Sequence, residues 1–245
     1  MSPGSQRPSS RGWEIRKHRP PQSTQTISFS GSTIAVCLTY EGRRYSGQYA
    51  DRVRVVAGTL RGRTLVAPEG SATRPTTDRT REAVFNALSS LGVLEGAVVV
   101  DLFAGSGALG IEALSRGATS CVFVESDSRA LAAIRQNLKT LDLEGRSEVV
   151  AGRVETVMTA MLPALTSSLG RVDLVFADPP YGYEGWDELT DRLESVVAVD
   201  AIAVIESGTE LEPSFAESSV WNVIRSKRYG RTWVTFLQHS DAVTD

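Results

Sequence analysis

Apolar residues along the chain form short runs that are typical of buried strands. These runs are rich in branched side chains and show little polar alternation, which favours strands covered on both faces of a parallel sheet. They occur at residues 98–100, 121–125, 147–150, 172–177 and 201–206. The pattern therefore predicts a sheet that is buried on both sides.

Between these runs, apolar residues recur every three or four positions, as on the buried face of an amphipathic helix. Because strands and helices alternate, the pattern indicates an α/β fold with a mostly parallel sheet and helices on both faces. Helices are predicted to begin near 76–78, where Thr or Asp can cap, and to cover 108–116, about 131–141 and 187–198.

Two further segments predict antiparallel hairpins. Residues 220–237 contain two apolar runs separated by Arg-Tyr-Gly-Arg at 228–231, which is typical of a hairpin that closes a sheet. Residues 53–66 show the same arrangement around Leu-Arg-Gly-Arg at 60–63. We therefore expect a seven-stranded main sheet and a small N-terminal β-hairpin.

These elements divide the chain into three parts. Residues 1–50 begin with a stretch rich in Ser, Pro, Gln and Arg and are predicted to be disordered or weakly structured. Residues 51–92 should form the basic hairpin and a helix. Residues 93–240 should form the sheet domain, and we find no internal repeat.

The first buried strand ends in a glycine-rich stretch, Asp101 to Gly107, with the sequence D-L-F-A-G-S-G. Gly105 and Gly107 allow the backbone to pass close to a ligand, and the N–H groups of the following helix point toward it. Asp101 places a carboxylate at the strand end, where it would repel a phosphate and attract an ammonium group. The stretch therefore predicts a site for a small polar molecule.

The glycines alone leave two cofactor classes open. Gly105, Gly107 and Gly110 also fit G-x-G-x-x-G, the dinucleotide fingerprint, and Glu125 stands about twenty residues on, where a ribose-binding acid is expected. A dinucleotide loop usually passes almost directly from the strand into its first glycine. Here Asp101 to Ala104 intervene, which favours a ligand that carries an ammonium group.

A second motif, Asp178, Pro179, Pro180 and Tyr181, follows the predicted strand at 172–177. The Asp178 carboxylate and the carbonyl after it can each accept one N–H of an exocyclic base amine, which aims the nitrogen lone pair at a methyl donor. The prolines supply no competing N–H and hold the turn rigid. Tyr181 can stack on the base. The alternative is that the prolines only end the strand. That alternative does not explain why the motif occurs together with the glycine-rich stretch.

Composition excludes several classes. The net charge of −3 argues against a protein that coats nucleic acid indiscriminately. No apolar run reaches the roughly 18–20 residues of a membrane span, so we expect a cytoplasmic protein. We also expect a monomer. The two cysteines and two histidines lack metal-ligand spacing, so no metal site is predicted.

The charge is unevenly distributed. Residues 1–81 hold 14 Lys and Arg against 5 Asp and Glu, whereas residues 82–245 hold 12 against 24. Arginines in the first turn of a helix oppose its dipole, and an anionic partner would remove that conflict. A solvated basic turn is the alternative. The candidates for contact with RNA phosphate or a cofactor carboxylate are Arg74, Arg79 and Arg81, and the hairpin arginines Arg61 and Arg63 are candidates for contact with RNA.

The two motifs together resemble class I methyltransferases that modify exocyclic amines with S-adenosylmethionine. Three further stretches are similar to the bacterial 16S rRNA guanine-N2 methyltransferases of the RsmD family, and the resemblance covers about residues 54–238. These stretches are R-V-V-A-G-T-L-R-G-R at 54–63, R-P-T-T-D-R-T-R-E-A-V-F-N-A-L at 74–88 and K-R-Y-G-R-T-W-V-T-F at 227–236.

The resemblance implies a Rossmann-like fold and methylation of the N2 amine of guanine 966 in 16S rRNA, within the small subunit or an assembly intermediate. It also implies that Asp178 to Tyr181 hold the guanine. Many methyltransferases read adenine with an Asp after the third strand, which this chain lacks, so backbone groups near Arg153 are expected to do so. The expected S-adenosylmethionine contacts are Asp101, Phe103, Gly105, Ser106, Gly107, Glu125, Ser126 and Arg153.

Three other functions would share part of this pattern. A DNA adenine-N6 methyltransferase would share D-P-P-Y, but no DNA-recognition domain is evident. A nicotinamide-dependent oxidoreductase leaves Asp178 to Tyr181 unexplained. A non-catalytic ribosome-binding factor would not need both Asp101 and Asp178. Appearance of methylated product separates these hypotheses.

Residues 1–50 fall outside the resemblance. One hypothesis is that the family-like chain begins near Val53 and that the extension reflects a gene start assigned too far upstream. The intact mass of the protein from its native cell tests this, because a full-length mass refutes it.

Overall fold

The computed structural model describes residues 24–25, 38–39, 53–68, 78–160, 170–211 and 220–240. The chain divides into two compact units, Met1–Asp51 and Arg52–Asp245. In the first unit, β1 (Thr24–Gln25) pairs antiparallel with β2 (Leu38–Thr39). The rest of the segment predicted to be disordered lies outside the described residues.

The second unit is built on a seven-stranded sheet with the order β10-β11-β9-β8-β5-β6-β7. The neighbours from β9 to β7 run parallel, while β11 is antiparallel to both β9 and β10. This confirms the predicted mostly parallel sheet closed by a hairpin. The strands are β5 (Val98–Leu102), β6 (Ser120–Glu125), β7 (Ser147–Ala151), β8 (Val172–Ala177), β9 (Val197–Ser207), β10 (Trp221–Tyr229) and β11 (Thr232–His239).

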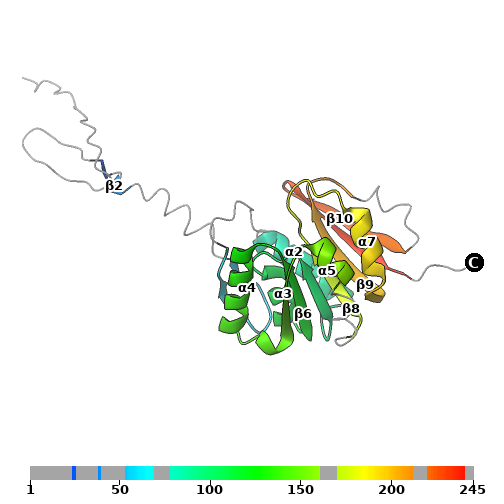
Figure 1. Ribbon diagram of the computed structural model, residues 1–245, viewed down its shortest axis with the longest axis horizontal. Coiled ribbons are helices and arrows are strands. Elements are labelled where there is room, and N and C mark those ends of the chain that lie inside the picture. The colour runs from blue at the N-terminus through cyan, green and yellow to red at the C-terminus, as the bar shows by residue number, and fades with distance from the viewer. Residues whose placement is uncertain are drawn as a thin grey trace, which may run out of the picture. The chain divides into compact units, whose positions relative to one another are not determined.

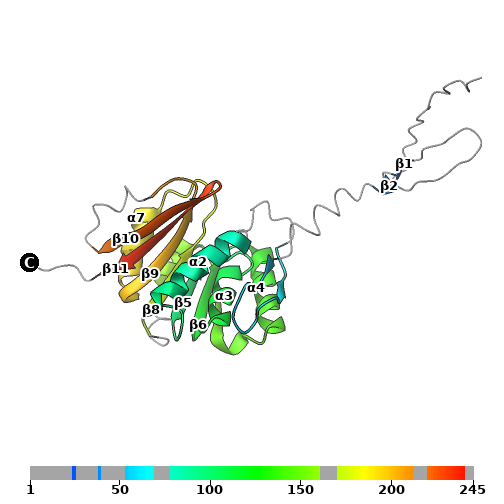
Figure 2. The ribbon, with the colours of Figure 1, turned by 180° about the vertical axis from the view of Figure 1, so that it is seen from behind.

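Helices cover both faces of this sheet, as predicted (Figures 1 and 2). One face carries α2 (Asp78–Leu91), α3 (Ala108–Ser115) and α4 (Ser128–Thr140). The other carries α5 (Val154–Ala160) and α7 (Trp186–Glu194), and a 3-10 turn at Glu144–Arg146 leads into β7. None of the helices in the described part of the chain is long and apolar enough to cross a membrane.

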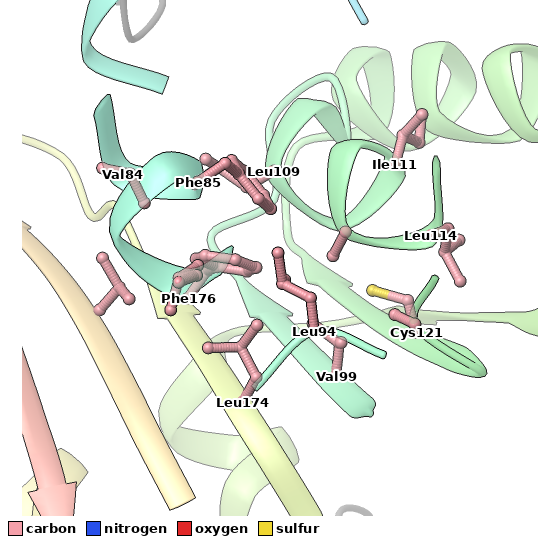
Figure 3. Close-up of a cluster of buried hydrophobic side chains, with 14 of the residues drawn as sticks. Val84, Phe85, Leu94, Val99, Leu109, Ile111, Leu114, Cys121, Leu174 and Phe176 are labelled. Carbon is pink, nitrogen blue, oxygen red and sulfur yellow. The ribbon is translucent and has the colours of Figure 1, made fainter. Parts of the chain in front are cut away.

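Neighbouring residues of β5 enter two separate cores, which explains the unbroken valine run. Val99 packs in the cluster under α2, α3 and α4, whereas Val100 packs in the cluster under α5 and α7. Alternate side chains of a strand point to opposite faces, so a strand covered on both sides needs apolar residues throughout. Figure 3 shows the first cluster, with Val84, Phe85, Leu109, Ile111 and Leu114 from the helices lying over Val99, Cys121, Leu174 and Phe176 from the strands.

The last predicted helix is shorter than expected, and the strand after it is longer. The helix predicted at 187–198 ends at Glu194, and β9 begins at Val197 rather than at 201. Val197 is fully buried and pairs with Val172 at the start of β8. Burial and pairing in the sheet therefore stabilise the β-branched residues near 197 more than an extension of the helix would.

The predicted N-terminal hairpin is present, with β3 (Val53–Arg54) antiparallel to β4 (Thr64–Leu65). Val53, Val55 and Leu65 are buried in the cluster under α2, α3 and α4. The hairpin is therefore packed onto the helical layer and is not a free arm.

Candidate active site

The two motifs found in the sequence leave the sheet side by side. Leu102, the last residue of β5, is opposite Val124 of β6 and Ala177 of β8. The residues that follow Leu102, Val124 and Ala177 in the sequence therefore lie at the same edge of the sheet. These residues are Phe103, Glu125 and Asp178. The strand order also changes direction between β5 and β8, and such points at the carboxyl ends of parallel strands are where α/β folds bind ligands.

The glycine-rich turn after β5 has a strained backbone. Phe103, Gly105 and Gly107 have φ angles of 58°, 57° and 78°. This left-handed region is open to glycine, but for a residue such as phenylalanine it costs about 1–3 kcal/mol. The structure therefore holds Phe103 in a conformation that it would not adopt alone.

An aromatic stack fixes the Phe103 ring. Its centroid is 5.3 Å from that of Tyr183, edge to face, and Tyr183 is 4.9 Å from Trp186 in the same manner. Burial raises the pKa of the half-buried Tyr183, and Glu155 and Glu188 add to the effect. Tyr183 and Trp186 are not among the residues predicted from the sequence, and the close spacing of aromatic residues after Tyr181 is the signal that indicates them.

Glu125 ties the glycine turn to the end of β6. Its Oε2 accepts a hydrogen bond from the Gly105 N–H at 2.8 Å, and its Oε1 accepts from the N–H groups of Ser126 at 2.7 Å and Asp127 at 2.8 Å. A carboxylate has about four acceptor sites, so Oε2 retains capacity for another donor. The Ser126 side chain is exposed beside it.

Asp101 lies beneath the turn, and this revises the predicted direct contact with a ligand. Its side chain is 1% exposed, and Oδ2 accepts from the Gly110 N–H at 2.8 Å. Burial raises the pKa of the Asp101 carboxyl well above its usual range, with Asp178 and Glu125 adding to the rise. Asp101 thus fixes the start of α3 from beneath the glycine turn.

The outer face of the turn is open at Gly105. A Cβ atom placed there would meet no heavy atom closer than the Phe103 carbonyl oxygen at 4.0 Å. At Gly107 a Cβ would lie 3.3 Å from the Phe123 ring, so that glycine serves internal packing and the left-handed turn that precedes α3. The surface above Gly105 and the exposed side of Ser106 is therefore available to a small molecule.

Asp178 and Pro179 are half-buried at the end of β8, while Pro180 and Tyr181 are exposed. The Tyr181 side chain is 71% exposed, which is unusual for a large aromatic residue. A Cβ atom on Gly208 would be 3.6 Å from its ring, so the ring lies over the chain that leaves β9. An exposed ring beside a half-buried carboxylate suits recognition of a planar polar group.

The predicted basic residues fall into different settings. Arg61 and Arg63 are exposed at the hairpin turn, and Arg63 also donates to the Thr140 carbonyl at 3.1 Å. Arg79 is exposed in the first turn of α2. Arg153 is exposed after β7, with its Nε 3.4 Å from Glu155. Arg74 lies outside the described residues.

Arg81 is buried and is not one of the exposed arginines, so its predicted contact with RNA is wrong. Its side chain is 1% exposed, and Nη2 donates to the Arg54 carbonyl at 2.6 Å and to Asp78 at 2.7 Å. Its Nε is 4.0 Å from Glu112. Burial lowers the pKa of the guanidinium, which the two acids counteract. Arg81 therefore locks α2 to the hairpin from inside.

Three polar residues that we did not predict hold the hairpin against α3 and α4. Glu112 is fully buried and accepts from the N–H groups of Val56 at 2.6 Å and Ala57 at 2.9 Å. Ser115 accepts from the Leu60 N–H and donates to the Ala57 carbonyl. Their positions inside an otherwise apolar helix pattern were the only sequence signal.

The third residue, Asn137, joins the hairpin to the glycine turn. Its Oδ1 accepts from the Val66 N–H at 2.7 Å, and its Nδ2 donates to the carbonyls of Val66 at 3.0 Å and Ser106 at 2.9 Å. One buried amide thus connects the basic segment with the candidate ligand loop.

Comparison with known proteins agrees with this arrangement. Residues 53–238 match the family described as Conserved hypothetical protein 95. The chain is 37% identical over 189 residues to YlbH of Bacillus subtilis, covering 76% of this chain and 98% of the relative. It is 36% identical over 161 residues to "Ribosomal RNA small subunit methyltransferase D" of Escherichia coli K12, covering 65% and 76%.

A solved structure supports the same relationship. The yhhF protein from Escherichia coli has a TM-score of 0.65 and 33% identity, covering 77% of this chain and 98% of its own. The family match begins at the hairpin and extends almost to the end of β11, so it includes both motifs at the carboxyl edge. The chain therefore belongs to this family, which is the RsmD family of methyltransferases.

Proposed function

We propose that this protein transfers a methyl group from S-adenosylmethionine to the exocyclic N2 amine of a guanine in 16S rRNA, within the small ribosomal subunit. The name of its Escherichia coli relative describes methylation of small-subunit rRNA. One observation carries the proposal, namely the register that places Phe103 and the glycine turn beside Asp178 at the topological switch. By the resemblance, the target is guanine 966.

The residues present fit the methyl donor. The open surface over Gly105 and Ser106, flanked by Phe103, would take the methionine part, and Glu125 has acceptor capacity for a ribose hydroxyl. The edge near Ser126 and Arg153 would take the adenine. S-Adenosylmethionine supplies an electrophilic methyl group on a sulfonium. Asp101 positions the turn from below.

Asp178 addresses the weak nucleophilicity of a purine amine, whose lone pair is delocalised into the ring. Its carboxylate and the carbonyl that follows would each accept one N–H, which favours a pyramidal nitrogen. The new N–CH3 bond forms as the S–CH3 bond breaks, and the nitrogen then loses one proton toward Asp178. Alignment of the two reacting groups can supply roughly 7–11 kcal/mol of the barrier.

Tyr181 would stack on the target guanine, a contact worth about 1–3 kcal/mol per base. A base inside a helix or loop must first be turned out, at a cost of a few kcal/mol. Arg61, Arg63 and Arg79 are exposed and would contact the RNA backbone, so residues 51–92 form the RNA-facing part. Phosphate contacts of this kind fix orientation and carry little sequence information.

The direct test is transfer of labelled methyl groups to purified small subunits, naked 16S rRNA and duplex DNA, with modified nucleosides identified by mass spectrometry. N2-methylguanosine in the RNA is the expected product. N6-methyladenine in DNA would instead establish the DNA methyltransferase alternative. Cofactor binding without any transfer would point to a non-catalytic protein.

A variant separates catalysis from cofactor binding. Asp178→Ala should lower turnover by roughly 10²–10⁴-fold, the range of a positioned acid–base group, while affinity for S-adenosylmethionine stays close to that of the wild type. Asp187→Ala, which removes an exposed acid in α7, should leave both unchanged. Loss of cofactor affinity in Asp178→Ala would show that its assigned role is wrong.

A further inference from the structure

A groove of about 490 Å³ runs between α2 and β10. Its lining residues are not among those assigned above to the methyl donor or the target base. Asn86, Ser90 and Leu91 line it on the α2 side, and Arg225, Lys227 and Tyr229 line it on the β10 side. Leu91 is 48% exposed. The groove therefore presents cations, amide and hydroxyl groups, an aromatic ring and apolar surface together.

The groove lies in the most basic segment of an acidic part of the chain. Residues 82–245 contain 12 Lys and Arg against 24 Asp and Glu, yet four of those cations lie within residues 225–231. No acidic residue occurs from 218 to 240. Such a local concentration of one charge on an oppositely charged body favours an anionic partner at that place.

Pairing with β11 places the two groove cations on the α2 face of the sheet. Arg225 is opposite Phe236 and Lys227 is opposite Val234, and both partners pack in the cluster under α2. The Arg225 guanidinium lies 5.9 Å from the Phe236 ring centroid, and the Lys227 ammonium lies 5.4 Å from that of Tyr229. Both side chains are exposed, and neither makes an ion pair with any residue that the structure describes.

The turn between β10 and β11 lies at the same edge of the sheet as Asp178. Trp233, near the start of β11, is opposite Ser207 at the carboxyl end of β9, and Ala177 of β8 is opposite Ile205. Three strand spacings separate β10 from β8 in the sheet, or about 14 Å at 4.7–4.9 Å each. A nucleic-acid strand with its base at Asp178 would therefore need to span only about this distance to reach the β10–β11 hairpin.

We propose that this groove binds the RNA strand that flanks the target nucleotide. This inference rests on the proposed function. Arg225 and Lys227 would contact phosphates, Tyr229 would stack on an unpaired base, and Asn86 and Ser90 would donate to sugar or base oxygens. Cations interleaved with aromatic rings are the usual surface for single-stranded nucleic acid. An acidic protein segment would use the cations but has less need of the ring.

The test compares two pairs of substitutions with the same change in charge. Arg225→Gln with Lys227→Gln removes the groove cations. Arg146→Gln with Arg171→Gln removes two exposed cations that precede β7 and β8, at the opposite edge of the sheet. Binding of the full-length protein to a 20-nucleotide oligouridylate and to purified small subunits is measured from about 50 to 200 mM salt.

The groove pair should weaken oligouridylate binding about tenfold at 150 mM salt. The slope of log affinity against log salt should become less steep by about 1.4, since each single-strand phosphate contact contributes about 0.7. The control pair should bind as the wild type does, and affinity for S-adenosylmethionine should be the same in all three proteins. Equal slopes in the groove and control pairs would overturn the proposal.

A second variant approaches the groove from its other wall. Asn86→Glu places an acid on the exposed surface of α2 without altering β10, and it should also weaken oligouridylate binding. Weaker binding to subunits with unchanged binding to oligouridylate would mean that the groove contacts a ribosomal protein, which refutes the RNA assignment. Groove-dependent RNA binding in a wild-type protein that methylates nothing would refute the proposed function alone.

Discussion

Glu112 shows how a single buried charge sets the architecture around it. Its carboxylate has no exposure to solvent and accepts from two hairpin N–H groups and from the Arg116 Nε at 2.7 Å, with Arg81 further off at 4.0 Å. An ion removed from water is tolerated only when partners of this kind surround it. Removal of one partner leaves the others without compensation.

Glu112→Ala is therefore expected to destabilise the protein by about 3–5 kcal/mol, because it leaves the buried Arg81 short of countercharge and two N–H groups without acceptors. Urea unfolding followed by circular dichroism measures this free energy. Glu82→Ala, at an exposed site in α2, should change it by less than about 0.5 kcal/mol. Similar values for both variants would contradict the role given to Glu112.

Asp101 gives a prediction with a definite sign. Its pKa is raised in the folded state by burial first, then by Asp178 and Glu125, so above an unfolded value of about 3.9 the folded protein retains a proton that the unfolded chain has lost. This group's contribution to stability therefore falls as pH rises through the window up to the raised pKa, and is constant above it.

Asp101→Asn removes that titration while the amide oxygen can still accept from Gly110. The stability of the variant relative to the wild type should rise with pH from about pH 4 upward and then level off. Denaturant unfolding of both proteins across this range provides the measurement. A stability difference that is independent of pH would show that Asp101 does not titrate as described.

Which residues could be foreseen depended on whether their partners are near in sequence. The glycine turn and Asp178 to Tyr181 are local motifs, and the structure brings them together as expected. Arg81 looked like an exposed arginine in a first helical turn. Its burial depends on Arg54 and Glu112, which are 27 residues before it and 31 residues after it, and no local pattern reveals that they meet.

Among the elements, the β3–β4 hairpin depends on α4 as well as on its own pairing. Its two short strands contribute only two paired positions each. Asn137 supplies both an acceptor and a donor to Val66, as a neighbouring strand would, and it also holds Ser106. The amide thus replaces a missing third strand and connects the hairpin to the glycine turn.

Asn137→Ala should loosen both segments. Each buried polar group left without a partner costs about 1–3 kcal/mol, so amide hydrogen exchange should accelerate at Val66 and in the glycine turn, and affinity for S-adenosylmethionine should fall. Gln136→Ala, on the exposed side of the same helix, should change neither. Faster exchange at Val66 alone would show that the connection to the turn carries no energy.

The elements themselves were largely predictable, because strands covered on both faces must be apolar throughout and helices must show their own period. The boundary between α7 and β9 was not. Residues 195–198 fit either pattern locally, and the choice is made by pairing of Val197 with Val172, a contact that sequence spacing does not contain.

For the whole molecule, the sheet order places the two cationic surfaces at opposite ends. The β3–β4 hairpin docks on α3 and α4, and α4 covers the β6–β7 end of the sheet. Strand β10 forms the opposite edge of the sheet. Asp178 and the glycine turn lie between them. A long RNA substrate would then be held on both sides of its target nucleotide.

Sites far apart with no shared partners have additive effects, so the two surfaces should add in their salt dependence. Arg61→Gln with Arg63→Gln should make the slope for small-subunit binding less steep by about 1.4–1.8, and combining this pair with Arg225→Gln and Lys227→Gln should about double that change. If all four substitutions have only the effect of one pair, the RNA does not contact both surfaces at once.

The polar contacts from Glu112, Ser115 and Asn137 reach the main chain of the hairpin, and they add to the packing of the buried Val53, Val55 and Leu65 side chains. The groups that Glu112, Ser115 and Asn137 hold are the N–H or C=O groups of Val56, Ala57, Leu60 and Val66, none of which depends on a particular side chain. The anchoring residues all belong to the helical scaffold. The exposed side chains of Arg61 and Thr64 take no part in these contacts, so a chimera that exchanged only these two positions for those of a relative should keep the docked hairpin while changing the surface that we propose contacts RNA.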